Sequence, residues 1–258
     1  MRRPRQKKPD PSSRLRRLQT RPAVLITGAS GGIGRAIGLA FAGIGWHIGI
    51  HYSRNRRAAE TTLRQVLACG GTGDLYHADI READAVQRMI DEWRVRVPIT
   101  SAFICNAGIA ESALVVRHSE HVWDEVIATN LTGTFLCLRA MAPALLTNGG
   151  GSIVVVGSHT GFHGAVGQAA YATSKAGLIG LVQTAAWEWG PQNIRINLIL
   201  PGWQKTSLTK GIFPEGTGWP DHALRRPASL DEAARTAVHL AQLKNVSGQV
   251  WNCDSRHL

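Results

Sequence analysis

A short apolar run that meets a cluster of glycines is the feature of this sequence that most restricts its fold. Residues 23–26 (Ala-Val-Leu-Ile) lead into residues 27–34 (Thr-Gly-Ala-Ser-Gly-Gly-Ile-Gly), and a helical pattern follows from Gly34 to Gly43. A strand, a glycine turn and a helix in this order bring backbone N–H groups and a positive helix N-terminus to one place, where a pyrophosphate can bind. Gly28 would permit the tight turn, Gly32 a close approach of the backbone, and Gly34 the packing of the helix on the strand. The turn therefore predicts a dinucleotide site.

Buried-strand patterns alternate with helical patterns along the rest of the chain. Continuous apolar runs stand at residues 46–50, 100–105, 152–156 and 194–200, and helical patterns stand at residues 55–68 and 83–95. Runs that are apolar on both faces are typical of a parallel sheet covered by helices on both sides. We predict an α/β fold, with a single doubly wound, Rossmann-type domain over residues 22–258 and no second domain.

The basic charge of the chain is concentrated at its N-terminus. The first 21 residues hold nine of the 29 basic side chains and one of the 18 acidic ones, so +8 of the formal charge of +11 lies there. This tail has few apolar residues, and we expect it to be disordered. A solvated extension or a misassigned start is favoured over a contact with nucleic acid or an anionic surface. A transit peptide fits less well, because the tail has no apolar helix face.

The remaining composition bears on the compartment and on metals. Hydrophobic residues make up 44% and charged residues 18%, a globular composition. No stretch approaches the roughly 20 apolar residues that span a membrane. The four cysteines (Cys69, Cys105, Cys137 and Cys253) lie far apart and show neither disulfide-framework nor zinc-ligand spacing. We expect a cytoplasmic protein with no bound metal.

The segment after the second apolar run bears on the choice between NADH and NADPH. A NAD-specific site usually shows a carboxylate about 20 positions beyond the glycine turn, where it binds the ribose 2′-hydroxyl. Here no carboxylate stands before Glu60, whereas Arg54 is backed by two further arginines. A guanidinium pairs with a 2′-phosphate, so we expect NADPH rather than NADH. The alternative is that these arginines only line an exposed helix start, where the helix dipole slightly disfavours cations.

A tyrosine and a lysine begin a later helical stretch. Tyr171 and Lys175 are four residues apart and so share one helix face. A phenol with a pKa near 10 is a poor acid at neutral pH. A neighbouring ammonium and an oxidised nicotinamide would both lower that pKa. Such a pair alone is a common accident, but Ser158 stands 13 residues upstream, at the end of an apolar run. This context, together with the glycine turn, favours a catalytic role for the pair over an accident of spacing.

In order and spacing, these motifs resemble the short-chain dehydrogenase/reductase family. The resemblance covers residues 23 to about 252. Besides the glycine turn and the three residues above, it includes Asp79, Asn106-Ala107-Gly108, Asn130 within residues 128–133, Pro201-Gly202, and Thr206.

The resemblance implies a role for each catalytic candidate. Tyr171 would exchange a proton with the substrate oxygen. Lys175 would lower the pKa of Tyr171 and bind the nicotinamide ribose. Ser158 would polarise the carbonyl, and Asn130 would position a water in a proton relay. The implied cofactor-binding set is Gly28, Ser30, Gly32, Ile33, Gly34, Ser53, Arg54, Asp79, Ile80, Asn106, Ala107, Gly108, Tyr171, Lys175, Pro201, Gly202, Gln204 and Thr206.

Within the family, the chain most resembles 3-oxoacyl-[acyl-carrier-protein] reductases. The likeness rests on residues 157–161, 167–171, 175–180 and 201–206. Residues 146–150 and 185–189 lack the basic side chains that usually meet an acidic carrier protein. The usual Asp-Gly-Gly near the C-terminus is replaced by Cys253-Asp254-Ser255-Arg256-His257-Leu258. The resemblance implies a 3-oxoacyl thioester as substrate, with acyl carrier protein as a candidate partner.

Other interpretations stay open. The substrate could be another small ketone, a sugar or a cyclic alcohol. In a different class, the chain could be a non-catalytic dinucleotide sensor or scaffold that uses its basic tail, although Tyr171 and Lys175 are both present. Residues 203–222, with their aromatic side chains, are expected to form a substrate lid. The resemblance also implies a homotetramer or homodimer, paired through the helix around residues 123–138 and the helix that follows Tyr171.

Overall fold

The computed structural model describes residues 21–206, 209 and 219–258 of the chain. The expected basic tail, apart from Arg21, lies outside the described residues, as do positions 207–208 and 210–218 of the expected lid. None of the described helices combines the length and the apolar character of a segment that crosses a membrane.

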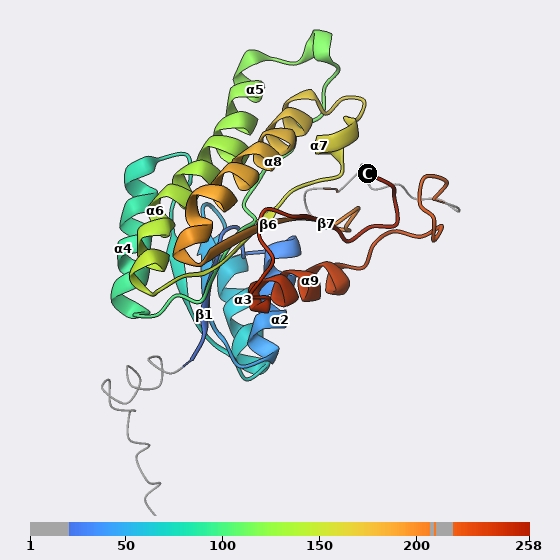
Figure 1. Cartoon of the computed structure of the whole chain (residues 1–258). Coiled ribbons are helices and arrows are strands. Elements are labelled where there is room, and N and C mark those ends of the chain that lie inside the picture. The colour runs from blue at the N-terminus through green and yellow to red at the C-terminus, as the bar shows by residue number, and fades with distance from the viewer. Residues whose placement is uncertain (1–20, 207–208, 210–218) are drawn as a thin grey trace, which may run out of the picture.

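A parallel sheet lies between two layers of helices (Figure 1). In the described residues it has seven strands, in the order β3-β2-β1-β4-β5-β6-β7. Their bounds are β1 Ala23–Ile26, β2 His47–Tyr52, β3 Thr72–His77, β4 Ala102–Cys105, β5 Gly151–Val156, β6 Ile194–Leu200 and β7 Val250–Asn252, and every neighbouring pair is parallel. The chain builds outward from β1 to β3, then crosses back to β4 and continues to the other edge. This is the predicted doubly wound α/β fold, which is confirmed.

The helices divide between the two faces of the sheet. On one face lie α4 (Ala83–Arg96), α6 (Gly133–Thr147) and α8 (Ala169–Trp189), with α5 (Glu120–Ile127) packed beside α8. On the other face lie α2 (Gly32–Gly43), α3 (Arg56–Ala68) and α9 (Leu230–Gln242). The shorter elements are η1 (Val115–Arg117), the π-helix η2 (Ala128–Thr132), α7 (Thr160–His163) and η3 (Gly190–Gln192).

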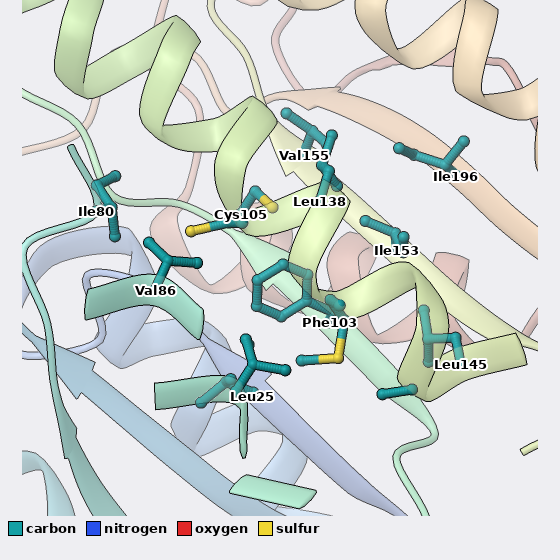
Figure 2. Close-up of a cluster of buried hydrophobic side chains, with 14 of the residues drawn as sticks. Leu25, Ile80, Val86, Phe103, Cys105, Leu138, Leu145, Ile153, Val155 and Ile196 are labelled. Atoms are coloured by element: carbon teal, nitrogen blue, oxygen red, sulfur yellow. The ribbon is translucent and has the colours of Figure 1, made fainter. Parts of the chain in front are cut away.

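Burial of both faces explains why the strands are continuously apolar. Along β1, Leu25 belongs to the core under α4, α6 and α8, whereas Val24 and Ile26 belong to the core under α2 and α9. Figure 2 shows the first of these cores, where Phe103 of β4 lies among side chains from the strands and from α6. Each large side chain buried in this way contributes about 1.5–3 kcal/mol to stability.

Several boundaries differ by one or two residues from those predicted, among them the following three. Helix α2 begins at Gly32 rather than Gly34, so the glycine turn itself supplies the first helical residues. Strand β2 continues past Ile50 to Tyr52. Strand β4 begins at Ala102, because Thr100 instead lies under α4, where its hydroxyl accepts a hydrogen bond from Trp93 Nε1 at 2.7 Å.

Candidate active site

The glycine turn leaves no room for side chains at two of its glycines. Gly28 has a φ of +65°, and a Cβ there would lie 2.8 Å from Ala107 Cα. A Cβ on Gly34 would lie 2.5 Å from the carbonyl oxygen of Gly28, so α2 packs directly on the turn. Gly32, with a φ of +53°, faces Thr206, whose methyl group would be 3.3 Å from a Cβ at that position. The turn is thus a bare backbone surface with Thr206 beside it.

The N-terminus of α2 has unused hydrogen-bond donors. Its N-cap, Gly31, provides no side-chain hydrogen bond, and no acidic residue stands in the first turn. The first N–H groups of a helix have no acceptor within the helix, and the helix dipole makes this end positive. The N–H groups of Gly32, Ile33 and Gly34 can therefore receive an anion, and the residues present fit the pyrophosphate of a dinucleotide.

The end of β4 holds this turn in place. Asn106 Nδ2 donates to the carbonyl oxygens of Thr27 at 3.0 Å and Gly28 at 3.1 Å. In return, Thr27 Oγ1 accepts from the backbone N–H groups of Asn106 at 2.9 Å and Ala107 at 3.1 Å. The Asn106 side chain therefore holds the glycine turn against the end of β4. Gly108, two residues further on, lies close to the catalytic candidates, since a Cβ on it would be 3.8 Å from Lys175 Nζ.

An ion pair follows the end of β3, and only one of its members, Asp79, was expected from the sequence. Asp79 accepts hydrogen bonds from Arg81 Nε at 3.0 Å and from Arg81 Nη2 at 2.6 Å. The Arg81 guanidinium holds the pKa of Asp79 below its usual value, and the charge of Arg54 adds to this effect. Arg81 also reaches Glu125 of α5 at 3.4 Å. We did not single out Arg81 from the sequence, because its partner Glu125 is 44 residues away.

The other expected cofactor residues near this end differ in exposure. Ser53 and Arg54 are exposed at the end of β2. The Ile80 side chain is buried in the core and would meet a Cβ on Gly133 at 2.9 Å. Only the backbone of Ile80 can therefore face a ligand.

Three catalytic candidates meet at the carboxyl end of β5. Ser158 follows the strand, and Tyr171 and Lys175 project from the first turns of α8. Lys175 Nζ donates to the carbonyl oxygen of Val156 at 2.8 Å and lies 5.7 Å from the centre of the Tyr171 ring. The Ser158 hydroxyl acts on Tyr171 and lowers its pKa. A phenol, a hydroxyl and an ammonium so placed can orient a carbonyl and give it a proton.

Burial has the largest effect on the pKa values of Tyr171 and Lys175. It raises the pKa of Tyr171, and the Ser158 hydroxyl offsets this only in part. Burial also lowers the pKa of Lys175 to about 8. From the sequence we expected Lys175 to lower the pKa of Tyr171. In the protein itself, burial instead raises this pKa. At neutral pH Tyr171 is protonated and can act as a proton donor.

Asn130 lies in the π-helix η2 and is fully buried. Its Oδ1 accepts from the backbone N–H of Ile109 at 2.8 Å. Its Nδ2 donates to the carbonyl oxygen of Ile109 at 2.9 Å and to Ser174 Oγ at 3.1 Å. The side chain thus fixes the loop after β4 against α8, one residue from Lys175.

The segment after β6 completes the site. Gly202 has a φ of +72°, and a Cβ there would lie 2.7 Å from Asp254 Oδ2 near the C-terminus. Gln204 is buried and donates to the carbonyl oxygen of Pro201 at 2.6 Å. We did not expect Asp254 to contribute here, because the sequence shows only its departure from a family motif. Among the described residues, no group of three His, Cys, Asp or Glu side chains could hold a metal ion.

Comparisons with known proteins agree with this geometry. The model of the short chain dehydrogenase family matches residues 22–216. A 3-oxoacyl-[acyl-carrier-protein] reductase from Staphylococcus epidermidis is 35% identical over 88% of this chain and 95% of its own length. The human (3R)-3-hydroxyacyl-CoA dehydrogenase is 39% identical over 78% of this chain and 80% of its own length. A crystal structure described as that of a short-chain alcohol dehydrogenase from Sinorhizobium meliloti 1021 superimposes with a TM-score of 0.84 at 26% identity, over 92% of this chain and 97% of that one. The chain therefore belongs to the short-chain dehydrogenase family and is an NAD(P)-dependent oxidoreductase.

Proposed function

We propose that this enzyme uses NADPH to reduce the ketone of a 3-oxoacyl thioester to a secondary alcohol, with Tyr171 as the proton donor. The observation that carries the proposal is the group of Ser158, Tyr171 and Lys175 at the end of β5, in which burial keeps the phenol protonated. A reduction needs such a donor at the moment when negative charge develops on the substrate oxygen.

Each side chain of the group has a task in this reaction. The Ser158 and Tyr171 hydroxyls bind the carbonyl oxygen together, and Tyr171 gives up its proton. The Lys175 ammonium, held by the Val156 carbonyl, stabilises the phenolate that remains. A bound nicotinamide supplies the hydride. The glycine turn and the α2 N-terminus hold the cofactor so that the reacting atoms meet in a fixed geometry.

The substrate class is supported by the relatives. One is named for a 3-oxoacyl group on acyl carrier protein and the other for a 3-hydroxyacyl group on coenzyme A, and both of these are thioesters. The end of α8, where a carrier protein would need basic partners, has Glu188 as its charged residue, and Trp187 beside it is exposed. We therefore propose a thioester substrate, and the assay below distinguishes coenzyme A from acyl carrier protein as its carrier.

The decisive assay follows the absorbance of NADPH in the presence of acetoacetyl-coenzyme A, a matched acyl-carrier-protein thioester and a panel of simple ketones. Faster turnover of either thioester than of any ketone supports the proposal. Turnover of simple ketones alone overturns the thioester assignment and favours the alternative, a reductase of a small ketone, a sugar or a cyclic alcohol.

The preference for NADPH rests on Arg54. Its guanidinium is exposed at the end of β2 and acts electrostatically on Asp79, at the expected adenine-ribose end of the site. Arg54→Ala should weaken NADPH binding roughly tenfold or more and change NADH binding little, because a charge-assisted bond to a phosphate is lost. Arg64→Ala, at an exposed arginine further along α3, is the matched control. Equal losses for both cofactors would show that Arg54 does not contact a 2′-phosphate.

We further propose a cytoplasmic homotetramer or homodimer. Large apolar side chains are exposed on the helices expected to pair: Trp123 on α5, Phe135 on α6 and Trp187 on α8 are 36%, 41% and 86% exposed. Light scattering of the purified protein tests this, and Trp123→Glu should shift the mass towards the monomer. A monomeric wild-type protein would contradict the proposal.

A further inference from the structure

A buried histidine that no motif includes lies between the glycine turn and the end of β3. His51 stands near the end of β2 and is 1% exposed. The backbone N–H of Gly28 donates to His51 Nδ1 at 2.9 Å, and His51 Nε2 lies 3.1 Å from the carbonyl oxygen of Ala78. The carbonyl oxygen of His51 also accepts from the N–H of Ala29 at 3.0 Å.

These contacts fix the state of the ring. An amide N–H can only donate, so Nδ1 must be the unprotonated nitrogen, and Nε2 carries the proton that it donates to Ala78. A second ring proton would be directed at the N–H of Gly28. Burial lowers the pKa of His51 to about 4, with the charge of His77 acting in the same direction and the Ala78 carbonyl and Asp79 acting against it. The imidazole is therefore neutral near pH 7, and both of its nitrogens have partners.

The two partners of the ring lie at different parts of the cofactor site. Gly28 is the first glycine of the turn that faces the pyrophosphate. Ala78 immediately precedes Asp79, which the family resemblance places at the adenine. Because Gly28 and Ala29 both donate to His51, the glycine turn is held against the end of β2.

We propose that His51 is a positioning residue for the dinucleotide, whose neutral ring fixes the glycine turn relative to the adenine-binding end of β3. The proposal rests on the dinucleotide part of the proposed function and is independent of the substrate. His51 does not touch the cofactor; it acts through Gly28 and Ala78. Losing it would leave a buried N–H without an acceptor and allow the turn to move away from the geometry that the pyrophosphate needs.

The main test measures NADPH affinity directly, by titrating the fluorescence of bound NADPH with the intact protein. His51→Phe keeps an aromatic ring, although a larger one, and removes both hydrogen bonds, so it should raise the Kd roughly tenfold or more. His51→Asn places an oxygen close to the position of Nδ1 and should restore most of the affinity. His51→Gln extends its amide beyond that position and should restore less. If the His51→Phe protein does not fold, the test is whether His51→Asn binds NADPH more tightly than His51→Gln.

His47 provides a matched control on the same strand. It is also 1% exposed, points to the same face as His51, and has its Nδ1 2.9 Å from Thr72 Oγ1, at the opposite end of β2. His47→Phe should lower the melting temperature and leave the NADPH Kd unchanged. A His51→Phe protein that binds NADPH like the wild type, or an equal loss of affinity in His47→Phe, would overturn the proposal. Wild-type protein that binds NADPH but reduces no thioester would contradict the proposed substrate alone.

Discussion

At the scale of single residues, the buried Lys175 reduces the stability of the fold. Lys175 is 5% exposed, and burial holds its pKa at about 8, below the ordinary value of 10.5. Between these two pH values the unfolded chain binds more protons than the folded chain, so the free energy of unfolding rises with pH across this window. Across this window the free energy of unfolding rises by about 3 kcal/mol.

Replacing this lysine should separate stability from activity. At pH 7 the free energy of unfolding of Lys175→Met should exceed that of the wild type by about 3 kcal/mol, because a buried charge is removed. The variant should also lose turnover. Denaturant unfolding of both proteins at pH 7 and at pH 10 checks this, since the difference should shrink at the higher pH. Unfolding curves that keep the same separation at both pH values would contradict the buried-charge argument.

Tyr171, the proposed proton donor, allows a sharper separation of binding from turnover. Tyr171→Phe removes one hydroxyl and leaves the ring beside Lys175. We expect NADPH binding to stay close to that of the wild type and turnover to fall by about 10²–10⁴, the usual contribution of a positioned acid. Fluorescence titration and steady-state assays measure the two quantities. Retained turnover would remove Tyr171 from the mechanism.

At the scale of elements, α2 contains two glycines with opposite requirements. A Cβ on Gly34 would lie 2.5 Å from both Asn106 Nδ2 and the Gly28 carbonyl oxygen, whereas a Cβ on Gly43 would meet nothing within 4 Å. Gly34→Ala should therefore cost about 1–3 kcal/mol through overpacking and weaken NADPH binding. Gly43→Ala should gain up to about 1 kcal/mol, because alanine loses less entropy in a helix. Thermal unfolding of the two variants checks this, and shifts of the same sign would contradict it.

The elements themselves could be read from the sequence, for a local reason. The apolar runs that became β1, β4 and β5 are buried on both faces, and burial of this kind leaves a pattern in consecutive residues. The glycine turn is equally local, since Gly28, Gly32 and Gly34 lie within seven positions. The boundaries were less predictable: Thr100 left the expected strand because of its contact with Trp93 under α4.

At the scale of the whole molecule, the partners of the site residues could not be predicted, because they depend on contacts between distant segments. His51 meets Gly28 across 23 positions and Arg81 meets Glu125 across 44. Neither pair leaves a pattern in its own neighbourhood. The sequence indicated Asn130 only through a family motif, and its contact with Ser174 required η2 and α8 to be packed together.

The C-terminal segment, residues 252–258, is the most distant of these contributors. It ends beside α7 (Figure 1), where His159 Nε2 lies 2.8 Å from the carbonyl oxygen of His257. Its Asp254 side chain is fully buried, accepts a hydrogen bond from Arg256 Nε at 2.8 Å and lies 3.2 Å from His222 Nε2. The backbone N–H of Ala223 donates to the Ser255 carbonyl oxygen at 3.1 Å. One short segment thus joins the turn after Ser158 to residues 222–223.

This arrangement predicts that one carboxylate affects both folding and substrate binding. Asp254→Asn leaves the largely buried Arg256 without its partner, so it should cost about 3–5 kcal/mol of stability. It should also raise the KM for the carbonyl substrate more than the Kd for NADPH, because the segment bonds to the turn that follows Ser158 and makes no such bond to the glycine turn among the described residues. Glu92→Gln, which breaks an exposed ion pair with Arg96, should cost less than about 1 kcal/mol and leave both constants unchanged. Denaturant unfolding and steady-state kinetics of the two variants test this, and an Asp254→Asn protein that behaves like Glu92→Gln would show that the C-terminal segment does not shape the site.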